Sequence, residues 1–457
     1  MNVMSRIETT VPSATTGIYH GWLVVVAAFV IACFGWGIGF YGPGIYLVAL
    51  QHRHGWPMAD ISTAITAYYL LGATLILSVG GVFERFGARL TVSTGATAMA
   101  CGIVLLTLVA RPWHVYAAFA VMSFGWAAMS GAALNIIIAP WFDKRRGLAI
   151  SLALNGASAG GVVIAPLLVF LIGRLNFAAA LSCVAVLMLA VILPTAAFVL
   201  RCKRIGERDA ADEGGDLMRT PPPVPVPAAP APLWQLSAVL RSRNFQTISV
   251  PFALGLVAQV GFLTHQVAYL SPNLGTAGAG WAVSVTTSAA VAGRLLVGLF
   301  VDKLDRRGVA CGNFLVQSAG MALLATNSSA PMLYLGCILF GLGLGNLTSL
   351  PGLIIQQEFP RQHFSRIVGL IVAINQFAFA FGPGLLGYLQ QAKGNYTSAL
   401  VACFIVEVTA GVIVIFLGLA TSSAGRRQEM SFDAEGGFPT LLRVARPFAR
   451  SAPFTSS

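Results

Sequence analysis

Two charged residues lie deep inside long apolar runs of the sequence, and Arg294 is the more informative of them. An arginine at the centre of a membrane helix costs roughly 2.5–3.5 kcal/mol on insertion scales, so it normally faces a polar cavity. A guanidinium there offers two parallel donors at low dielectric, which suits a carboxylate. We therefore expect Arg294 to bind an anionic solute. The alternative is a structural arginine that reaches the bilayer surface or pairs with a neighbouring helix.

Glu407 is the second intramembrane charge, and His265 is a third group that could carry a proton. His265 has Gly261 and Tyr269 one turn away on the same helix face, and an imidazole titrates near neutral pH. The alternative for His265 is a neutral, hydrogen-bonded core residue. Small side chains around Glu407 favour close helix packing and a structural hydrogen bond. Both residues are candidates for proton coupling.

Further polar or aromatic residues in the apolar runs are candidates for lining a solute path. The first run is rich in Gly and Pro over residues 35–44, as is a later run at 382–384, and such interruptions often flank a transported substrate. Aromatic residues in long spans also pack helices together or form interface belts. The candidate substrate-binding residues besides Arg294 are Trp36, Tyr41, Asn155, Asn375 and Gln376.

The composition requires that these residues sit on membrane helices. Hydrophobic residues make up 56% of the chain, charged residues only 10%, and the mean hydropathy is +0.78. Soluble domains carry about a quarter charged residues, so most of this surface must face hydrocarbon. Apolar runs of spanning length predict an all-α membrane protein with helices over 21–49, 59–82, 89–110, 114–140, 147–172, 176–200, 244–271, 279–301, 309–328, 331–357, 366–390 and 396–420.

A polar segment with a dense proline stretch divides the spans into two sets of six. Proline at that density favours an extended, solvated linker over a helix. The predicted organisation is an N-terminal tail over 1–20, a six-helix bundle over 21–200, a linker over 201–243, a second bundle over 244–420 and a C-terminal tail over 421–457.

The formal net charge of +12 is a topology signal rather than a sign of nucleic-acid binding. With both tails and the linker on one side, that side collects 23 of the 28 Lys and Arg residues, while Arg53, Arg111, Arg174 and Lys393 fall opposite. Cytoplasmic loops retain positive charge. We expect a multi-pass protein of the cell (inner or plasma) membrane with both termini cytoplasmic.

A loop motif recurs in the two halves. Gly80–Arg89 places a glycine four residues before Glu84, and Gly298–Arg307 does the same with Asp302, 218 residues later. Glycines let two helices approach closely, and the arginines could pair with a carboxylate such as Asp143. The candidate gating residues are Gly80, Glu84, Arg85, Gly87, Arg89, Asp143, Gly298, Asp302, Lys303, Arg306 and Arg307.

These loops resemble the signature of the major facilitator superfamily, with Glu84 in place of the usual Asp and Asp305 in place of a Gly. The segments 19–22 and 141–149 further resemble those of monocarboxylate and oxalate–formate porters. The resemblance implies two pseudo-symmetric six-helix bundles, a cytoplasmic lock formed by the loop motifs, and substrate carboxylate binding by Arg294. Two departures stand out: the eleventh span lacks the second cation of the oxalate–formate porter, and Ala290 stands where mammalian monocarboxylate carriers have an aspartate.

A secondary transporter explains these features better than an enzyme or a sensor. The sequence has no HExxH motif, Walker A motif or metal-ligating cluster, so we expect no catalysis, ATP use, metal or cofactor. The predicted function is alternating-access transport of a small organic anion, monocarboxylate-like, by proton coupling or anion exchange, as a monomeric unit in the lipid bilayer. The alternative is proton-driven efflux of an amphipathic, drug-like compound.

Overall fold

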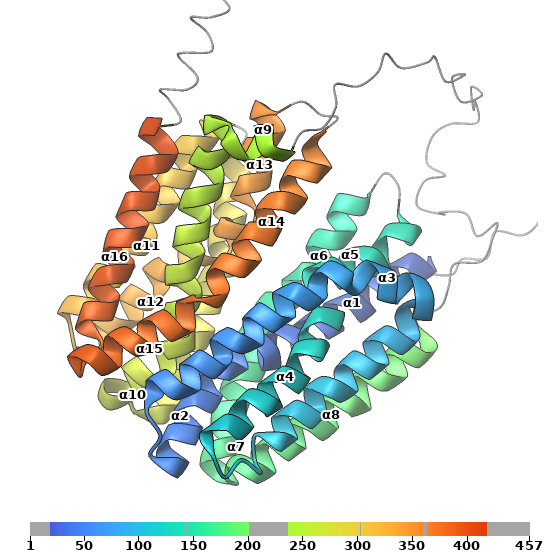
Figure 1. Cartoon of the computed structure of the whole chain (residues 1–457), viewed down its shortest axis with the longest axis vertical. Coiled ribbons are helices and arrows are strands. Elements are labelled where there is room, and N and C mark those ends of the chain that lie inside the picture. The colour runs from blue at the N-terminus through green and yellow to red at the C-terminus, as the bar shows by residue number, and fades with distance from the viewer. Residues whose placement is uncertain (1–18, 143–144, 201–235, 302, 360–362, 418–457) are drawn as a thin grey trace, which may run out of the picture.

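The computed structural model describes residues 19–142, 145–200, 236–301, 303–359 and 363–417. Within these ranges the regular structure is entirely helical, as the composition predicts. The predicted tails before Tyr19 and after Leu417, most of the predicted linker, Asp143 and Asp302 lie outside the described residues. Figure 1 shows two groups of helices, one from each half of the chain.

The N-terminal group contains all helices up to the linker. In chain order these are α1 (His20–Trp36), η1 (Gly37–Tyr41), α2 (Gly42–His54), α3 (Met58–Leu105), α4 (Pro112–Ala128), α5 (Gly131–Ile138), η2 (Ala139–Trp141), α6 (Arg146–Ala159), η3 (Gly160–Ile164), α7 (Ala165–Arg174) and α8 (Phe177–Phe198).

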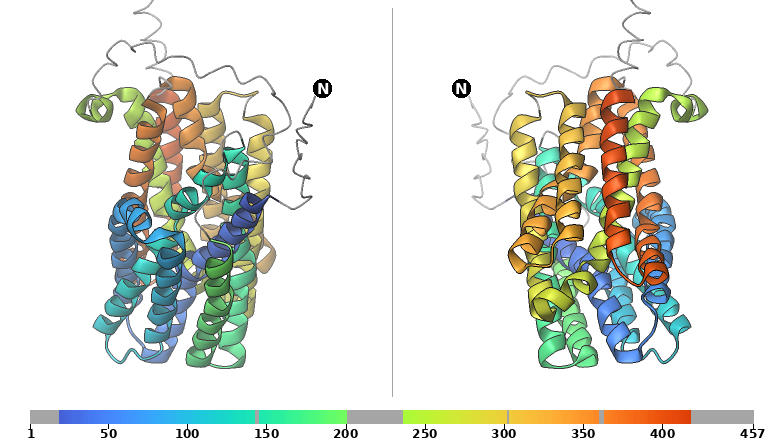
Figure 2. Two further views of the ribbon diagram at one scale, coloured as in Figure 1. Left: turned by 90° about the vertical axis from the view of Figure 1, so that its right-hand side faces the viewer. Right: turned by 90° about the vertical axis from the view of Figure 1, so that its left-hand side faces the viewer.

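The C-terminal group begins with a short helix that projects from the body of the molecule (Figure 2). Its elements are α9 (Leu236–Arg241), α10 (Arg243–Phe300), α11 (Arg306–Thr326), α12 (Ala330–Leu344), η4 (Asn346–Thr348), α13 (Leu350–Glu358), α14 (Phe364–Ala380), α15 (Gly382–Lys393), α16 (Thr397–Val412) and η6 (Ile413–Leu417).

Ten helical segments of the described chain are long and apolar enough to cross a membrane. Two of them are far longer than one bilayer, since α3 has 48 residues and α10 has 58. About 20 residues suffice to span. Gly87 interrupts α3 with φ +76° and Gly275 interrupts α10 with φ +69°, so each contains two spans. The twelve predicted spans are thereby confirmed.

Several spans are broken where the sequence carries glycine or proline. The first span contains a π-helical turn at Gly37–Tyr41 and the fifth contains another at Gly160–Ile164. The tenth is divided between α12 and α13 by the 3₁₀ turn Asn346–Thr348. Such breaks are often functional in membrane helices because they free backbone carbonyls for other contacts.

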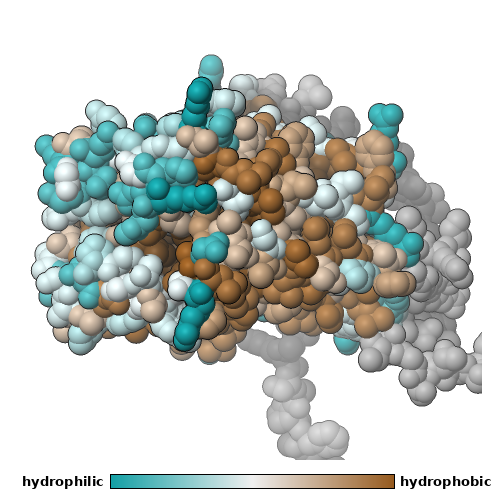
Figure 3. All heavy atoms as spheres, turned by 90° about the horizontal axis from the view of Figure 1, so that it is seen from below, coloured by the Kyte–Doolittle hydropathy of each residue, from teal (hydrophilic) through white to brown (hydrophobic). Residues whose placement is uncertain are grey.

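The two ends of the bundle differ, and we name them by the linker. The linker side carries α9, α13 and the two residues that border the undescribed segment, Leu200 and Leu236. The far side is the opposite end (Figure 1). Seen from the far side, an apolar area covering much of the N-terminal group lies beside a more hydrophilic area of the C-terminal group (Figure 3). The apolar area is typical of a surface that meets lipid.

The halves pack against each other toward the far side. The Thr66 hydroxyl of α3 accepts a bond from the Gly384 backbone N–H of α15 at 2.9 Å. At a second contact between the halves, Ser284 of α10 donates to the Val162 carbonyl of η3 at 3.2 Å. The two hydrogen bonds therefore join α3 to α15 and η3 to α10, one helix from each half in both cases.

The same helices separate toward the linker side. Beyond Ser158, α6 exposes Asn155 one turn away, and beyond Arg294, α10 exposes Gly298 on the face that carries Arg294, where a Cβ would meet nothing. Among the described residues, no hydrogen bond joins α6 to α10 on the linker side of the Ser158–Arg294 contact. The structure is therefore closed on the far side and open toward the linker.

Candidate functional site

Arg294 lies at the interface between the halves, at the α6–α10 contact toward the linker side. Its Nε donates to the Gly345 carbonyl at 3.3 Å within its own half, and its Nη1 donates to the Ser158 hydroxyl of the other half at 3.1 Å. The side chain is partly buried, and no Asp or Glu of the described chain contacts the guanidinium. Its positive charge is thus solvated by two neutral oxygens, and it can still bind an anion.

The break in the tenth span brings a carbonyl within reach of Arg294. A Cβ at Gly345 would collide with the Arg294 side chain, so only glycine lets the guanidinium lie against this backbone. Asn313 of α11 donates to the neighbouring Gly343 carbonyl at 3.2 Å, and Asn346 donates to Asn313 Oδ1 at 2.9 Å. The break is therefore fixed by side-chain hydrogen bonds that replace helix bonds.

Tyr41 meets the same region from the first span. Its buried ring lies against Gly161. A Cβ at Gly161 would collide with the Tyr41 ring and with the Thr287 side chain, so both side chains approach this glycine closely. The Tyr41 phenol also interacts electrostatically with the Arg294 guanidinium. Tyr41 is the end of the π-helical turn that follows Trp36, and this turn changes which face of the span points at the interface.

Asn155 lies one turn before Ser158 on the same face of α6 and is exposed. The positions of the two residues put Asn155 on the open, linker-side part of the interface. Its side chain makes no hydrogen bond within the described chain, so its amide is available to a solute.

Ser158 belongs to the segment Gly156–Gly160, which has the GxSxG spacing of serine hydrolases. In those enzymes the serine sits on a sharp strand-to-helix turn with a histidine base. Here it lies within helix α6 and its hydroxyl accepts from Arg294. Gly156 and Gly160 instead pack against the backbone of α1. The match is therefore a helix-packing pattern.

An aromatic group occupies the N-terminal side of the interface. Trp36 and Trp126 have ring centroids 5.1 Å apart, and Phe40 stacks on Trp126 at 6.1 Å. Phe379 of α14 contacts Phe40 at 6.4 Å and Tyr69 at 5.3 Å from the other half. Trp36 is thus placed beside the interface, in an apolar wall adjoining Tyr41.

Asn375 lies one turn before Phe379 on α14. It is 7% exposed, and its Oδ1 is buried without a hydrogen-bond partner. Buried amide oxygens are usually satisfied, so an unpaired one marks a position where a water or solute donor is expected. The neighbouring Gln376 is partly buried, and no hydrogen bond of the described chain joins either residue to Arg294.

Glu407 lies away from this interface, inside the C-terminal bundle. It is fully buried, and the Gln317 amide, oriented to satisfy its neighbours, donates to both carboxylate oxygens at 3.1 Å. Gln317 also contacts Gln259 at 3.3 Å. The carboxyl group therefore links three helices of one bundle, with no cation contacting it in the described chain.

His265 of α10 is buried toward the far side, between the start of α15 and Tyr396, which precedes α16. Its Nε2 lies 3.0 Å from the Pro383 carbonyl, which can only accept, so Nε2 carries the hydrogen. Its Nδ1 lies 3.0 Å from the Tyr396 hydroxyl. That hydroxyl is 3.3 Å from the Met58 sulfur, the first residue of α3. His265 is thus connected to a contact between the halves.

Among the described residues, the first loop motif makes no bond to the other half. Gly87 provides the positive φ that turns the chain, and a Cβ at Gly80 would meet nothing. Arg89 Nε donates to the Leu200 carbonyl at 2.8 Å, and Arg85 lies over the Phe86 ring. Glu84 is exposed at the linker side. These contacts stay within one half, as expected where the linker side is open.

The second copy of the motif uses other contacts. Asp305, where the family pattern has glycine, has φ −62° and caps α11 by accepting from the Gly308 N–H at 2.7 Å. Arg307 pairs with both oxygens of Glu358 at 2.6 and 2.7 Å. Lys303 is exposed and Gly298 faces open space.

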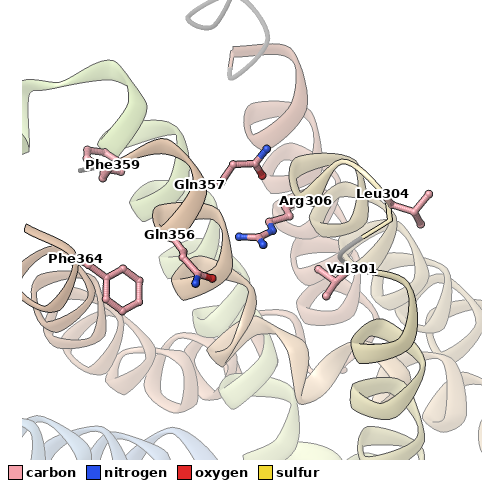
Figure 4. A pocket seen from close by; sticks show the side chains of 7 residues that line it. All are labelled: Val301, Leu304, Arg306, Gln356, Gln357, Phe359 and Phe364. Carbon is pink, nitrogen blue, oxygen red and sulfur yellow. The ribbon is translucent and has the colours of Figure 1, made fainter. Parts of the chain in front are cut away.

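Arg306 donates to the Leu353 carbonyl and lines a pocket of about 520 Å³ between α10, α11, α13 and α14. Figure 4 shows it near Gln356 and Gln357. This pocket lies within the C-terminal half, apart from Arg294.

The structure thus brings together Arg294, Tyr41 and, through the aromatic group, Trp36. Sequence reasoning missed Ser158, Gly345, Phe40 and Phe379. Ser158 could have been found from its one-turn spacing to Asn155. Gly345 stands among other glycines of its span, so its residue type alone does not single it out.

Known proteins resemble the chain over most of its length. Residues 27–277 and 266–454 match the family model of the Major Facilitator Superfamily. Monocarboxylate transporter 11 of Homo sapiens is 25% identical, covering 89% of this chain and 84% of that relative. The fujikurins efflux protein of Gibberella fujikuroi is 24% identical, covering 86% and 81%.

Solved structures show the same fold. The crystal structure of the nucleoside transporter NupG has a TM-score of 0.64 and 13% sequence identity, covering 89% of this chain and 99% of that chain. At that identity the likeness concerns the arrangement of helices and carries no information on the solute.

Proposed function

Because the chain belongs to the Major Facilitator Superfamily, whose members are membrane transporters and not enzymes, we propose that this secondary transporter moves a small, monocarboxylate-like organic anion. The observation that carries the proposal is Arg294, a cation at the interface with neutral oxygens as its partners. A solute carboxylate can accept two parallel bonds from this guanidinium at low dielectric.

The surroundings of Arg294 support a solute with one carboxylate and an apolar body. Tyr41 and the aromatic group on the other side of the interface offer apolar surface with few donors. Asn155 and Asn375 supply polar groups that the described chain leaves unpaired. A second carboxylate has no buried cation to meet at this interface in the described residues.

Alternating access follows from the bonds that Arg294 makes. Among the described residues, its contact with Ser158 is the hydrogen bond nearest the linker side between α6 and α10. A bound anion competes for the guanidinium and so changes a contact between the halves. We propose that the linker side is cytoplasmic, as the charge distribution favours, and that Arg85 or Arg89 engages Asp143 when this side closes.

We further propose that His265 carries the coupling proton. Protonation of Nδ1 would force the Tyr396 hydroxyl to turn away and donate to the Met58 sulfur. Proton uptake would thus alter a contact between the halves on the far side. Glu407 is the weaker candidate, because its position within one bundle leaves it far from this contact.

Efflux of an amphipathic compound is the second candidate function. It is favoured by the size of the aromatic group and by the resemblance to a fungal efflux protein. The two functions differ in their need for a carboxylate, since a neutral amphiphile gains nothing from a guanidinium.

The test is uptake of radiolabelled lactate and pyruvate into proteoliposomes containing the wild type, Arg294→Lys or Arg294→Ala. Arg243→Ala, an exposed cation on the linker side, is the matched control. We expect full uptake by the wild type and the control, partial uptake by Arg294→Lys and a large loss in Arg294→Ala. His265→Gln should still take up the acids but lose the acceleration by an imposed pH gradient. Equal acid uptake by all variants would remove the carboxylate assignment.

A further inference from the structure

A second space between the halves lies at the far side, apart from Arg294. This pocket has a volume of about 790 Å³ and is walled by α2, α7 and the two spans of α10. The Ser284–Val162 hydrogen bond and the packing of Tyr41 against Gly161 lie between it and the open linker side. Its size is typical of a ligand site.

The walls of this far-side pocket are apolar and its mouth faces the lipid. Ile45, Val48 and Ala49 form one stripe of α2. At the mouth, Phe170 of α7 is 56% exposed and Trp281 of α10 is 63% exposed. Both lie on helix faces that continue as exposed apolar side chains, which is typical of contact with acyl chains.

The rim of the pocket is cationic. Arg174, the last residue of α7, is exposed, and its guanidinium carbon lies 5.5 Å from the centre of the Phe170 ring. His52, in the last turn of α2, lines the same pocket. No Asp or Glu is among its described lining residues. From Pro166 to Arg174 the wall extends roughly 12 Å along the helix axis.

We propose that the far-side pocket binds an acidic phospholipid. The headgroup phosphate contacts Arg174 and His52 at the membrane boundary, and one acyl chain lies along the apolar stripes of α2 and α7. Charge complementarity selects the acidic headgroup, because the described lining carries the Arg174 cation and no acid. The lipid contacts both halves, so it stabilises the conformation that is closed on the far side.

The test is native mass spectrometry of the purified protein with phosphatidylglycerol or phosphatidylcholine of identical acyl chains. We expect the wild type to retain phosphatidylglycerol preferentially and Arg174→Gln to lose about fivefold in affinity for it. The matched control is Arg111→Gln, which removes an exposed cation of the same side that lies outside the pocket. Ala277→Phe, which fills the pocket, should lower retention without changing the rim.

Other results would overturn the proposal. Equal losses in Arg174→Gln and Arg111→Gln would mean a general surface attraction. Oleate binding as tightly as phosphatidylglycerol would make this a site for free fatty acids. Displacement of the lipid by millimolar pyruvate would make the pocket the outer end of the solute path. Retention that is unchanged by both pocket variants would leave no lipid site here.

Discussion

The two halves of the molecule share a fold but differ in what they bury. In the N-terminal half the buried polar side chains of the described residues are all hydroxyls, together with an aromatic group around Trp126. The C-terminal half buries a much wider set of polar groups. These include Gln259, His265, Gln266, Arg307, Asn313, Gln317, Asn346, Asn375 and Glu407.

This difference indicates that the two halves contribute different groups to the interface. The C-terminal half supplies the cation and the polar network that fixes the break beside it, while the N-terminal half supplies apolar surface and the Ser158 hydroxyl. A solute between such walls would place its charged end toward one half and its apolar body toward the other. Substitutions in each half should therefore have different effects.

The largest effect should come from removing the cation of the C-terminal half. We expect Arg294→Ala to lower acid uptake about 100-fold, because hydrogen bonds to charged groups contribute roughly 1.5–3 kcal/mol each. Arg294→Lys should recover only a part, since an ammonium lacks the planar fork. Initial rates in proteoliposomes, corrected for protein content, measure both. Normal rates in Arg294→Ala would mean that the C-terminal half does not bind the solute carboxylate through Arg294.

A smaller effect should follow from moving the cation without removing it. The methyl group of Gly345→Ala would collide with the Arg294 side chain and displace the guanidinium from its position. We expect acid uptake to fall about tenfold, as for one lost charge-assisted bond. Gly352→Ala, in the same span but facing open space, is the control. Equal rates in the two variants would show that the position of Arg294 is not fixed by this carbonyl.

The N-terminal half should set the preference for solute size. Trp36→Ala removes part of the aromatic wall, so longer acids should gain relative to lactate, by about fourfold for each added methylene. Competition of labelled lactate uptake by acids of increasing chain length measures the preference. An unchanged order of competition would place the apolar body of the solute elsewhere.

The smallest effect should come from Glu407. Because Glu407→Gln keeps a group that can bond to Gln317, we expect acid uptake to stay within about twofold of the wild type. Glu407→Leu should instead lower the melting temperature, since it leaves buried amides unpaired. Loss of pH-driven accumulation in Glu407→Gln, with stability unchanged, would give this residue the coupling role that we assign to His265.

The sequence predicts the architecture well because hydropathy is a property of whole segments. The twelve spans needed only run lengths, and the loop motifs located the turns after the second and eighth spans. Arg294 was identified from its isolation in an apolar run. All of these signals are visible without knowing which helices touch.

The partners of these residues could not be predicted in the same way. The Ser158–Arg294 contact depends on how two bundles meet, and the Gly345 carbonyl depends on a local break in α12–α13. Gln317 lies far from Glu407 in sequence, so their hydrogen bond has no local pattern. Asn375 was found as a polar residue in a span, but its unpaired oxygen is a property of packing.

The most direct measurement compares one acid with its primary amide, which has nearly the same shape without the charge. We predict that pyruvate competes with labelled lactate for the wild type and that pyruvamide does not. In Arg294→Ala this discrimination should disappear. Equal competition by the acid and the amide in the wild type, or unchanged discrimination in the variant, would contradict recognition of a carboxylate by Arg294.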